Sequence, residues 1–268
     1  MAFIIKNFTD LMELDPQGDD GYVGLSPEYP WGRVYGGQVV AQGLRAAYHT
    51  VDEAFHVHSL HAYFIRGGDS DEPIRYEVDQ IRNGRSFMTR RVVALQSGGP
   101  ILNMSASFQV REEEAEIQEV FVPEGLARPV DLKPESWNTV MEHCRLPDQL
   151  APARSMSWIR ILTELGDDSA LQACALAYTS DDFPTEAARL SYPIEPPAHG
   201  DDDRFMGASL DHAIWFHRPG RNDRWALHDF HGMGLAGARG LAVGQVFDTE
   251  GVHMATVAQE LLMRRKKG

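Results

Sequence analysis

Cysteine is scarce in this sequence of 268 residues, which contains only Cys144 and Cys174. Two cysteines cannot form a disulfide framework or a zinc site built from cysteines alone. So few cysteines are compatible with a reducing compartment. Cys174 lies in a predicted helix, where a small core residue is a more ordinary role than a nucleophile. Disulfide-rich and cysteine-zinc proteins are therefore excluded as classes.

Positive charge is also in short supply. The chain has 25 Lys and Arg against 39 Asp and Glu, a formal net charge of −14. Its only basic cluster is the segment 264–267 (RRKK), which is typical of a solvated chain end. A nucleic-acid-binding domain normally carries a basic stripe on one face. We therefore expect no nucleic-acid partner.

Long apolar runs and targeting signals are missing. No stretch approaches the roughly 20 apolar residues that a membrane-spanning helix requires. The N-terminal segment meets its first acidic residue at Asp10 and has no long apolar core, so it is not typical of a secretory signal. The last residues, RRKKG, are not the peroxisomal tripeptide. We expect a cytoplasmic protein without a membrane span.

Several familiar catalytic motifs are absent too. Residues 207–211 (GASLD) begin like a nucleophile elbow, but the fifth position is Asp where that turn needs Gly. No glycine-rich loop has the spacing that binds phosphates or dinucleotides. The histidines on predicted strands lack the spacing of metal ligands and are more typical of half-buried structural residues: His56, His58, His61, His212, His217, His228 and His231. We expect no metal and no cofactor.

The first half does contain a helix followed by four strands. Residues 35–48 (YGGQVVAQGLRAAY) place apolar residues at helical spacing on a narrow face of small side chains. Gly43 inside this helix costs about 1 kcal/mol relative to Ala, so we expect a sheet to pack very closely against it. Runs with strand composition or alternating polarity follow at 58–65, 74–81, 86–96 and 101–110.

The composition changes after residue 110. An acidic run and scattered prolines predict a linker over about 111–153, with one short helix at 135–143. The second half then repeats the order of the first, with a helix at 169–178 and an insertion that reaches about residue 203. Its predicted strands are 157–162, 207–216, 225–230, 240–247 and 252–262.

Two local matches support a tandem duplication. MSASFQ at 104–109 matches MATVAQ at 254–259, and His61-Ala62 matches His212-Ala213. The pattern predicts an α+β fold of two antiparallel sheets, each wrapped around a central helix. The predicted domains are 1–112 and 154–268, with 113–153 as the linker. If the copies pack edge to edge, a groove between them suits a long, thin ligand.

Three polar residues of the second half are candidates for chemistry. Asp181, with Asp182 beside it, follows the second helix, where the plain alternative is a capping turn stopped by Pro184. Ser209 lies in a predicted strand, where a satisfied buried hydroxyl is the ordinary case. Gln259, in an otherwise apolar strand, would by default face solvent. Taken alone, these residues do not decide a function.

Longer motifs carry a family resemblance. They are VYGGQVVAQ (34–42), HSLHAYFIRGGD (58–69), RNGRSF (82–87), SASFQ (105–109), ASLDHAIWFHRP (208–219), ARG (238–240) and VAQE (257–260). In this order, across about residues 31–268, they resemble the type II acyl-CoA thioesterases, the TesB-like family with a double (tandem) hotdog fold.

The resemblance implies an enzyme that hydrolyses fatty acyl-CoA without a cofactor, using water activated between Asp181, Ser209 and Gln259. Asp181 would take a proton from the water, while the other two hold the water or stabilise the oxyanion. Partial burial should raise the pKa of Asp181 above its usual ~4. The first half keeps Ser59 and Gln109, but no acid directly follows its helix. We therefore expect chemistry only in the second half.

Other functions are compatible with the same motifs. A non-catalytic acyl-CoA-binding or sensor protein is the main alternative, and a hotdog hydratase would need an Asp/His pair on one loop, which we do not find. Family members of this fold usually pair further, so we expect a homo-oligomer. Four arginines are candidates for the CoA phosphates, with a solvent-facing role as the alternative: Arg82, Arg85, Arg90 and Arg91.

Overall fold

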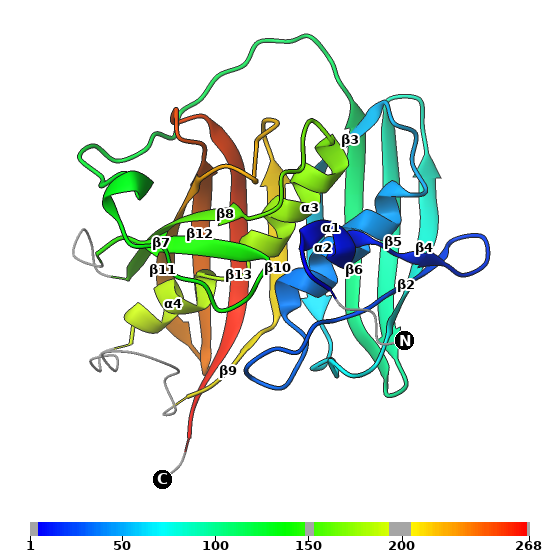
Figure 1. Cartoon of the computed structure of the whole chain (residues 1–268), viewed down its shortest axis with the longest axis horizontal. Coiled ribbons are helices and arrows are strands. Elements are labelled where there is room, and N and C mark those ends of the chain that lie inside the picture. Colours follow the sequence, from blue (N-terminus) through cyan, green and yellow to red (C-terminus); the bar gives the residue numbers. More distant parts are fainter. Residues whose placement is uncertain (1–4, 148–152, 193–204, 267–268) are drawn as a thin grey trace.

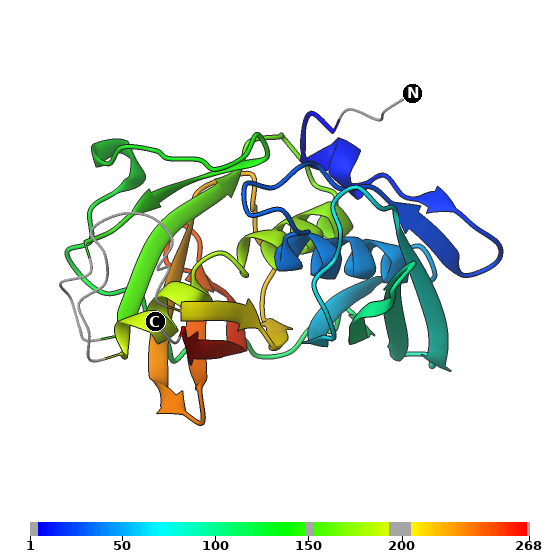
Figure 2. The same ribbon diagram turned by 90° about the horizontal axis from the view of Figure 1, so that it is seen from below.

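The strands form one continuous antiparallel sheet in the computed structural model, which describes residues 5–147, 153–192 and 205–266. This 13-stranded sheet has the order β1-β2-β4-β5-β6-β3-β10-β13-β12-β11-β8-β7, and β9 pairs with β13. Figure 1 shows the two halves side by side, and Figure 2 shows the sheet curving around the helices. The expected two sheets are therefore joined into one, because pairing of β3 with β10 removes an exposed edge from each half.

The first half contains the predicted helix and four strands, preceded by a short helix and two short strands that were not predicted. In chain order these are α1 (Phe8–Met12), β1 (Asp15–Pro16), β2 (Gly21–Gly24), α2 (Gly36–Tyr48), β3 (Phe55–Phe64), β4 (Ile74–Asn83), β5 (Phe87–Gln96) and β6 (Gly99–Val110).

Helix α2 packs tightly on the inner face of the sheet. A Cβ atom added at Gly43 would lie 3.2 Å from Met104 Cε on β6 and 3.7 Å from Val92 Cγ1 on β5. The expected close approach of a sheet at Gly43 is confirmed, and it explains why the helix carries a residue that weakens helices. Helices α2 and α3 also lie against each other.

The remaining elements include three that the sequence analysis missed, η1, β7 and α4. They are η1 (Pro129–Asp131), β7 (Met141–Arg145), β8 (Arg154–Ile161), α3 (Ser169–Thr179), α4 (Pro184–Leu190), β9 (Phe205–Ser209), β10 (Asp211–Phe216), β11 (Ala226–Ala236), β12 (Arg239–Phe247) and β13 (His253–Arg265). Helix α4 lies in the predicted insertion, of which residues 193–204 are outside the described part of the chain.

The predicted helix at 135–143 is wrong. Glu135 forms an isolated antiparallel bridge with His143, and β7 pairs along its length with β8. The strand buries Met141 in the main core and Cys144 in a smaller cluster, so both of its faces are covered. In a helix these two residues, three apart, would lie on one face, whereas in a strand they point to opposite faces and reach separate cores.

Two hydrophobic cores hold the fold together. The main core lies between the helices and the sheet, and the smaller one is covered by linker residues such as Val122 and Leu132. Cys144 and Cys174 are buried and unpaired, and burial raises the pKa of the Cys174 thiol to about 12. Cys174 is therefore a protonated core residue. No helix within the described ranges is long and apolar enough to span a membrane.

Candidate active site

The three predicted site residues come together at the point where α3 ends beside the start of α2. Asp181 follows the α3 C-cap, Ser209 ends β9 and Gln259 lies on β13. Ser209 Oγ donates a hydrogen bond to Asp181 Oδ1 at 3.3 Å, and Gln259 Nε2 donates to Ser209 Oγ at 2.7 Å. The default alternative, that Gln259 faces solvent, is wrong, because the residue is 0% exposed.

Ser209 reaches Asp181 because the predicted strand 207–216 is broken at Leu210. The segment before the break, β9, pairs only with β13, where Ser209 faces Leu261. The segment after it, β10, lies between β3 and β13. Ser209 itself is half-buried.

Asp181 is held by the N-terminus of the other half's helix. Its Oδ2 accepts a hydrogen bond from the Gly37 N–H at 2.8 Å, while Tyr35, the N-cap residue of α2, makes no side-chain cap. A carboxylate at this position is favoured by the helix dipole. Burial nevertheless raises the pKa of Asp181 to about 6, against the lowering effect of hydrogen bonds from Gln259, Gly37 and Ser209.

His212 is a further member of the cluster that the sequence analysis treated only as a half-buried strand histidine. It is 0% exposed. Its Nδ1 lies 2.5 Å from Gln259 Oε1, and its Nε2 lies 2.9 Å from Ser180 Oγ. Burial lowers the pKa of His212 to about 4, with the Gln259 hydrogen bond acting in the opposite direction. The ring is therefore neutral at neutral pH.

Comparison with known proteins identifies the family. Models of the acyl-CoA thioesterase N-terminal domain and of acyl-CoA thioesterase match residues 25–109 and 136–262. Acyl-CoA thioesterase 2 of Haemophilus influenzae is 34% identical, covering 98% of this chain and 99% of its own. Human acyl-coenzyme A thioesterase 8 is 32% identical over 96% of this chain and 89% of its own. The chain belongs to the acyl-CoA thioesterase family.

Solved structures agree with this assignment. The acyl-CoA thioesterase II TesB2 of Mycobacterium marinum matches with a TM-score of 0.85 and 36% identity, covering 97% of this chain and 99% of that one. A hot dog fold protein of Alicyclobacillus acidocaldarius matches with a TM-score of 0.80 at 20% identity, covering 97% and 98%. The resemblance to type II thioesterases and the expectation of a thioester hydrolase are confirmed, and the fold is a hotdog fold.

A second buried carboxylate lies next to Asp181 in this thioesterase. The Asp182 side chain is 14% exposed, and its Oδ1 accepts a hydrogen bond from Trp137 Nε1 at 3.1 Å. Its Oδ2 lies 3.8 Å from His143 Nδ1, and neither atom has a hydrogen-bond partner among the described residues. Burial raises the pKa of Asp182 to about 7; the Trp137 hydrogen bond lowers it and the charge of Asp181 raises it.

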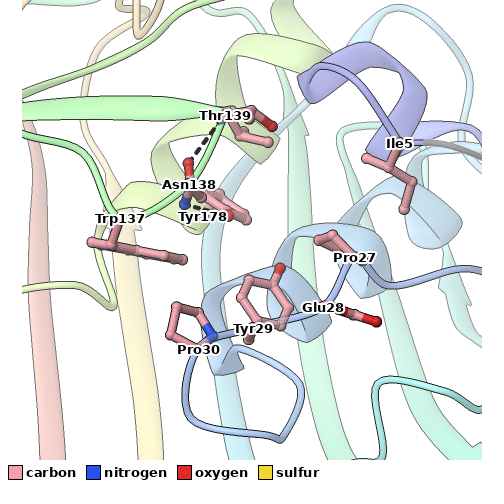
Figure 3. Close-up of a pocket in the computed structure, with 10 residues that line it drawn as sticks. Ile5, Pro27, Glu28, Tyr29, Pro30, Trp137, Asn138, Thr139 and Tyr178 are labelled. Carbon is pink, nitrogen blue, oxygen red and sulfur yellow. Dashed lines mark hydrogen bonds between the residues drawn. The ribbon is translucent and has the colours of Figure 1, made fainter.

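Trp137 and His143 could not be found from the sequence, because both lie in the segment predicted as a linker. Trp137 also lines a cavity of about 340 Å³ between this segment and the loop that contains residues 27–30 (Figure 3). Tyr29, Pro30 and Tyr178 are among its other lining residues. The indole that donates a hydrogen bond to Asp182 is therefore also part of the cavity wall.

The arginines proposed from the sequence divide into two groups. Arg90 is 1% exposed, and its guanidinium donates hydrogen bonds to Thr50 Oγ1 at 2.7 Å and to Asn83 Oδ1 at 2.7 Å. It is therefore a structural residue, and its candidacy for CoA phosphates is wrong. Arg82 and Arg85 are exposed and stay as predictions. Exposed Arg91 pairs with Asp79 at 3.0 Å.

No group of three or more His, Cys, Asp or Glu in the described part of this thioesterase is arranged to hold a metal ion. The cluster of titratable and polar groups at the site is instead built from hydrogen bonds among an acid, a hydroxyl, an amide and an imidazole. Such a set can orient water and transfer a proton without a metal.

Proposed function

We propose that this chain hydrolyses fatty acyl-CoA to a fatty acid and CoA, with a water molecule activated between Asp181, Ser209 and Gln259. The observation that supports this most directly is the contact among the three side chains, which come from segments far apart in the sequence. A carboxylate beside a hydroxyl and an amide supplies both a proton acceptor and hydrogen-bond donors.

In the proposed reaction the water oxygen forms a bond to the thioester carbonyl carbon while its proton passes to Asp181. The Ser209 hydroxyl and the Gln259 amide orient the water and donate toward the charge that develops on the carbonyl oxygen. The tetrahedral intermediate then collapses, the carbon–sulfur bond breaks, and the departing sulfur takes the proton from Asp181. The products are a carboxylic acid and the CoA thiol.

The pKa of Asp181 suits a general base at neutral pH. A carboxylate with a pKa of about 6 is a stronger base than an ordinary aspartate and is still ionised above that pH. General-base assistance contributes about 10²–10⁴-fold to a rate. Gly37 fixes Oδ2 and leaves Oδ1 on the side of Ser209.

We also propose that the chain is a double hotdog, with hotdog domains at 1–112 and 154–268 and a linker at 113–153. Two separate family models, ending at residue 109 and beginning at residue 136, support this division. So does the edge-to-edge pairing of β3 with β10. The linker contributes β7 to the sheet and covers the smaller core, so it packs against the second domain.

We further propose a homo-oligomer in the cytoplasm that binds no nucleic acid. The unpaired cysteines support a reducing compartment, and the net charge of −14 opposes binding to phosphate backbones. Light scattering after size-exclusion chromatography measures the oligomeric state directly. A monomer at micromolar concentration would contradict this part of the proposal.

Thiol release from acyl-CoAs of increasing chain length tests the function. We expect release by the wild-type protein, and a fall in kcat of about 10²–10⁴-fold for Asp181→Asn with an unchanged circular dichroism spectrum. Tight binding without thiol release by the wild type would favour the sensor alternative. Full turnover by folded Asp181→Asn would remove Asp181 as the base.

A further inference from the structure

His212 connects the site to the residue that precedes Asp181. It lies on β10 opposite Gln259 on β13, because Ala213 and Ala258 are register partners in this pair of strands. One ring nitrogen contacts the Gln259 amide oxygen and the other contacts the Ser180 hydroxyl. All three side chains are 0% exposed, so water does not compete for these hydrogen bonds.

The hydrogen bonds to His212 and to Ser209 together fix the orientation of the Gln259 amide. One end of an amide only accepts hydrogen bonds and the other only donates them. The Ser209 hydroxyl gives its one proton to Asp181, so its oxygen accepts a hydrogen bond from the amide nitrogen. A neutral His212 with its proton on Nδ1 donates to Gln259 Oε1, and this turns the amide nitrogen toward Ser209.

Ser180 lies on the other side of the His212 ring and fits this tautomer. With the proton on Nδ1, Nε2 is an acceptor for the Ser180 hydroxyl at 2.9 Å. The other acceptor near that hydroxyl is the Ala177 carbonyl oxygen at 3.1 Å. A neutral imidazole carries one N–H, so while the Ser180 hydroxyl donates to Nε2 the ring proton lies on the nitrogen that faces Gln259.

The hydrogen bonds therefore run in one direction, from Ser180 through His212, Gln259 and Ser209 to Asp181. Each group donates to the next. An ionised carboxylate only accepts hydrogen bonds, so the direction of this hydrogen-bonded chain cannot be reversed while Asp181 is charged. In such a chain each bond polarises its neighbours, and the last donor is strengthened.

We propose that His212 and Ser180 are positioning residues, which hold the Gln259 amide with its nitrogen toward Ser209 and thereby keep the site ready for water. This inference rests on the proposed function. Neither residue touches the reacting atoms, so the change expected on removing His212 is a kcat about 10- to 100-fold lower, with KM little altered.

Two substitutions at His212 separate positioning from packing. His212→Leu fills the space and removes both ring nitrogens, and we expect it to show the full loss of kcat. His212→Asn keeps an N–H donor close to the position of Nδ1, and we expect it to recover most of the lost kcat. Ser180→Ala removes the hydroxyl that contacts Nε2, and we expect an intermediate loss of kcat.

His228→Leu is the matched control. His228 is also 0% exposed and lies on β11 of the same sheet, but neither ring nitrogen has a hydrogen-bond partner among the described residues. Burial alone lowers the pKa of His228 to about 3, so it too is a neutral histidine. We expect His228→Leu to keep wild-type kcat and an equal or higher melting temperature.

A double-variant cycle with Gln259→Leu decides the proposal. If His212 acts through Gln259, His212→Leu costs no further kcat once Gln259 is gone, and the double variant equals Gln259→Leu. Losses that multiply, or a His212→Leu protein with wild-type kcat beside an impaired Gln259→Leu, would overturn the proposal. Full turnover in Gln259→Leu would overturn this inference and the proposed site together. Should His212→Leu not fold, Ser180→Ala in the same cycle gives the answer, and multiplied losses would again overturn it.

Discussion

The Gly37 N–H and the Asp181 carboxylate are 2.8 Å apart, although 144 residues separate them in the chain. The acid thus belongs to the second half and its backbone donor to the first. Gly36 has no room for a side chain, since a Cβ atom would lie 2.7 Å from Asp181 Oδ2 and 3.0 Å from the Phe64 ring. The candidate site is therefore shared between the two halves.

Gly36→Ala is expected to abolish most activity. The added methyl group would displace either the Asp181 carboxylate or the first turn of α2, and a shift of about 1 Å at a reacting group costs on the order of 10²-fold. The backbone itself is not strained by alanine there, because Gly36 does not have a positive φ. Thiol-release kinetics measure the change in kcat.

Gly43→Ala in the same helix is the control for this prediction. Its added methyl group meets the flexible end of Met104 at 3.2 Å, and alanine improves helix propensity by about 1 kcal/mol. We expect nearly wild-type kcat. Equal losses in the two variants would show that the defect comes from α2 as a whole and not from the carboxylate.

The pH dependence of kcat/KM should follow the ionisation of the acid pair. With the pKa of Asp181 raised to about 6, the base is protonated and inactive below that pH. We expect the rate to fall about tenfold per pH unit below about pH 6 and to level off above it. Because Asp182, with a pKa of about 7, interacts with Asp181, the profile reports the pair. A flat profile between about pH 5 and pH 8 would contradict a role for Asp181 as the base.

Much of the fold was predictable because periodic burial leaves a pattern in the sequence. Helix α2 and the long strands of the first half follow that pattern. Strand β7 does not, since its burial arises only when it pairs with β8 and meets linker side chains on the other face. Helix α4, which begins with Pro184, lies in a segment that otherwise resembles an insertion.

The candidate site was predictable only in part. Asp181, Ser209 and Gln259 were found through family resemblance, since no spacing in the sequence brings three such distant residues together. Trp137 and His143 were missed because they lie in a segment without a motif. Their contacts with Asp182 depend on how the chain folds back over the end of α3.

Asp182→Asn is expected to stabilise the protein above neutral pH. The pKa of Asp182 is about 7 in the folded protein and near 4 when unfolded, so the folded state binds more protons and its stability falls as pH rises between these values. Asparagine stays neutral, and it can still accept from Trp137 and donate toward His143. We expect about 1–2 kcal/mol of added stability at about pH 8, measured by urea unfolding.

Trp137→Phe tests the ionisation of Asp182 by removing its hydrogen-bond donor. The substitution keeps an aromatic wall for the cavity but removes the N–H that lowers the pKa of Asp182. We expect a steeper loss of stability with rising pH than in the wild type, the opposite of Asp182→Asn. Parallel stability curves for all three proteins would show that Asp182 titrates normally.

Arginine substitutions in the first half should separate a structural residue from a ligand candidate. Arg90→Lys leaves Thr50 Oγ1 and Asn83 Oδ1 without the planar donor that now serves both, and lysine cannot reproduce that geometry. We expect a loss of about 1–3 kcal/mol in the free energy of unfolding, with KM for acyl-CoA unchanged. Exposed Arg85→Lys is the matched variant and should leave stability unaltered. A raised KM in Arg90→Lys at unchanged stability would contradict the structural role of Arg90 and support a role in binding CoA.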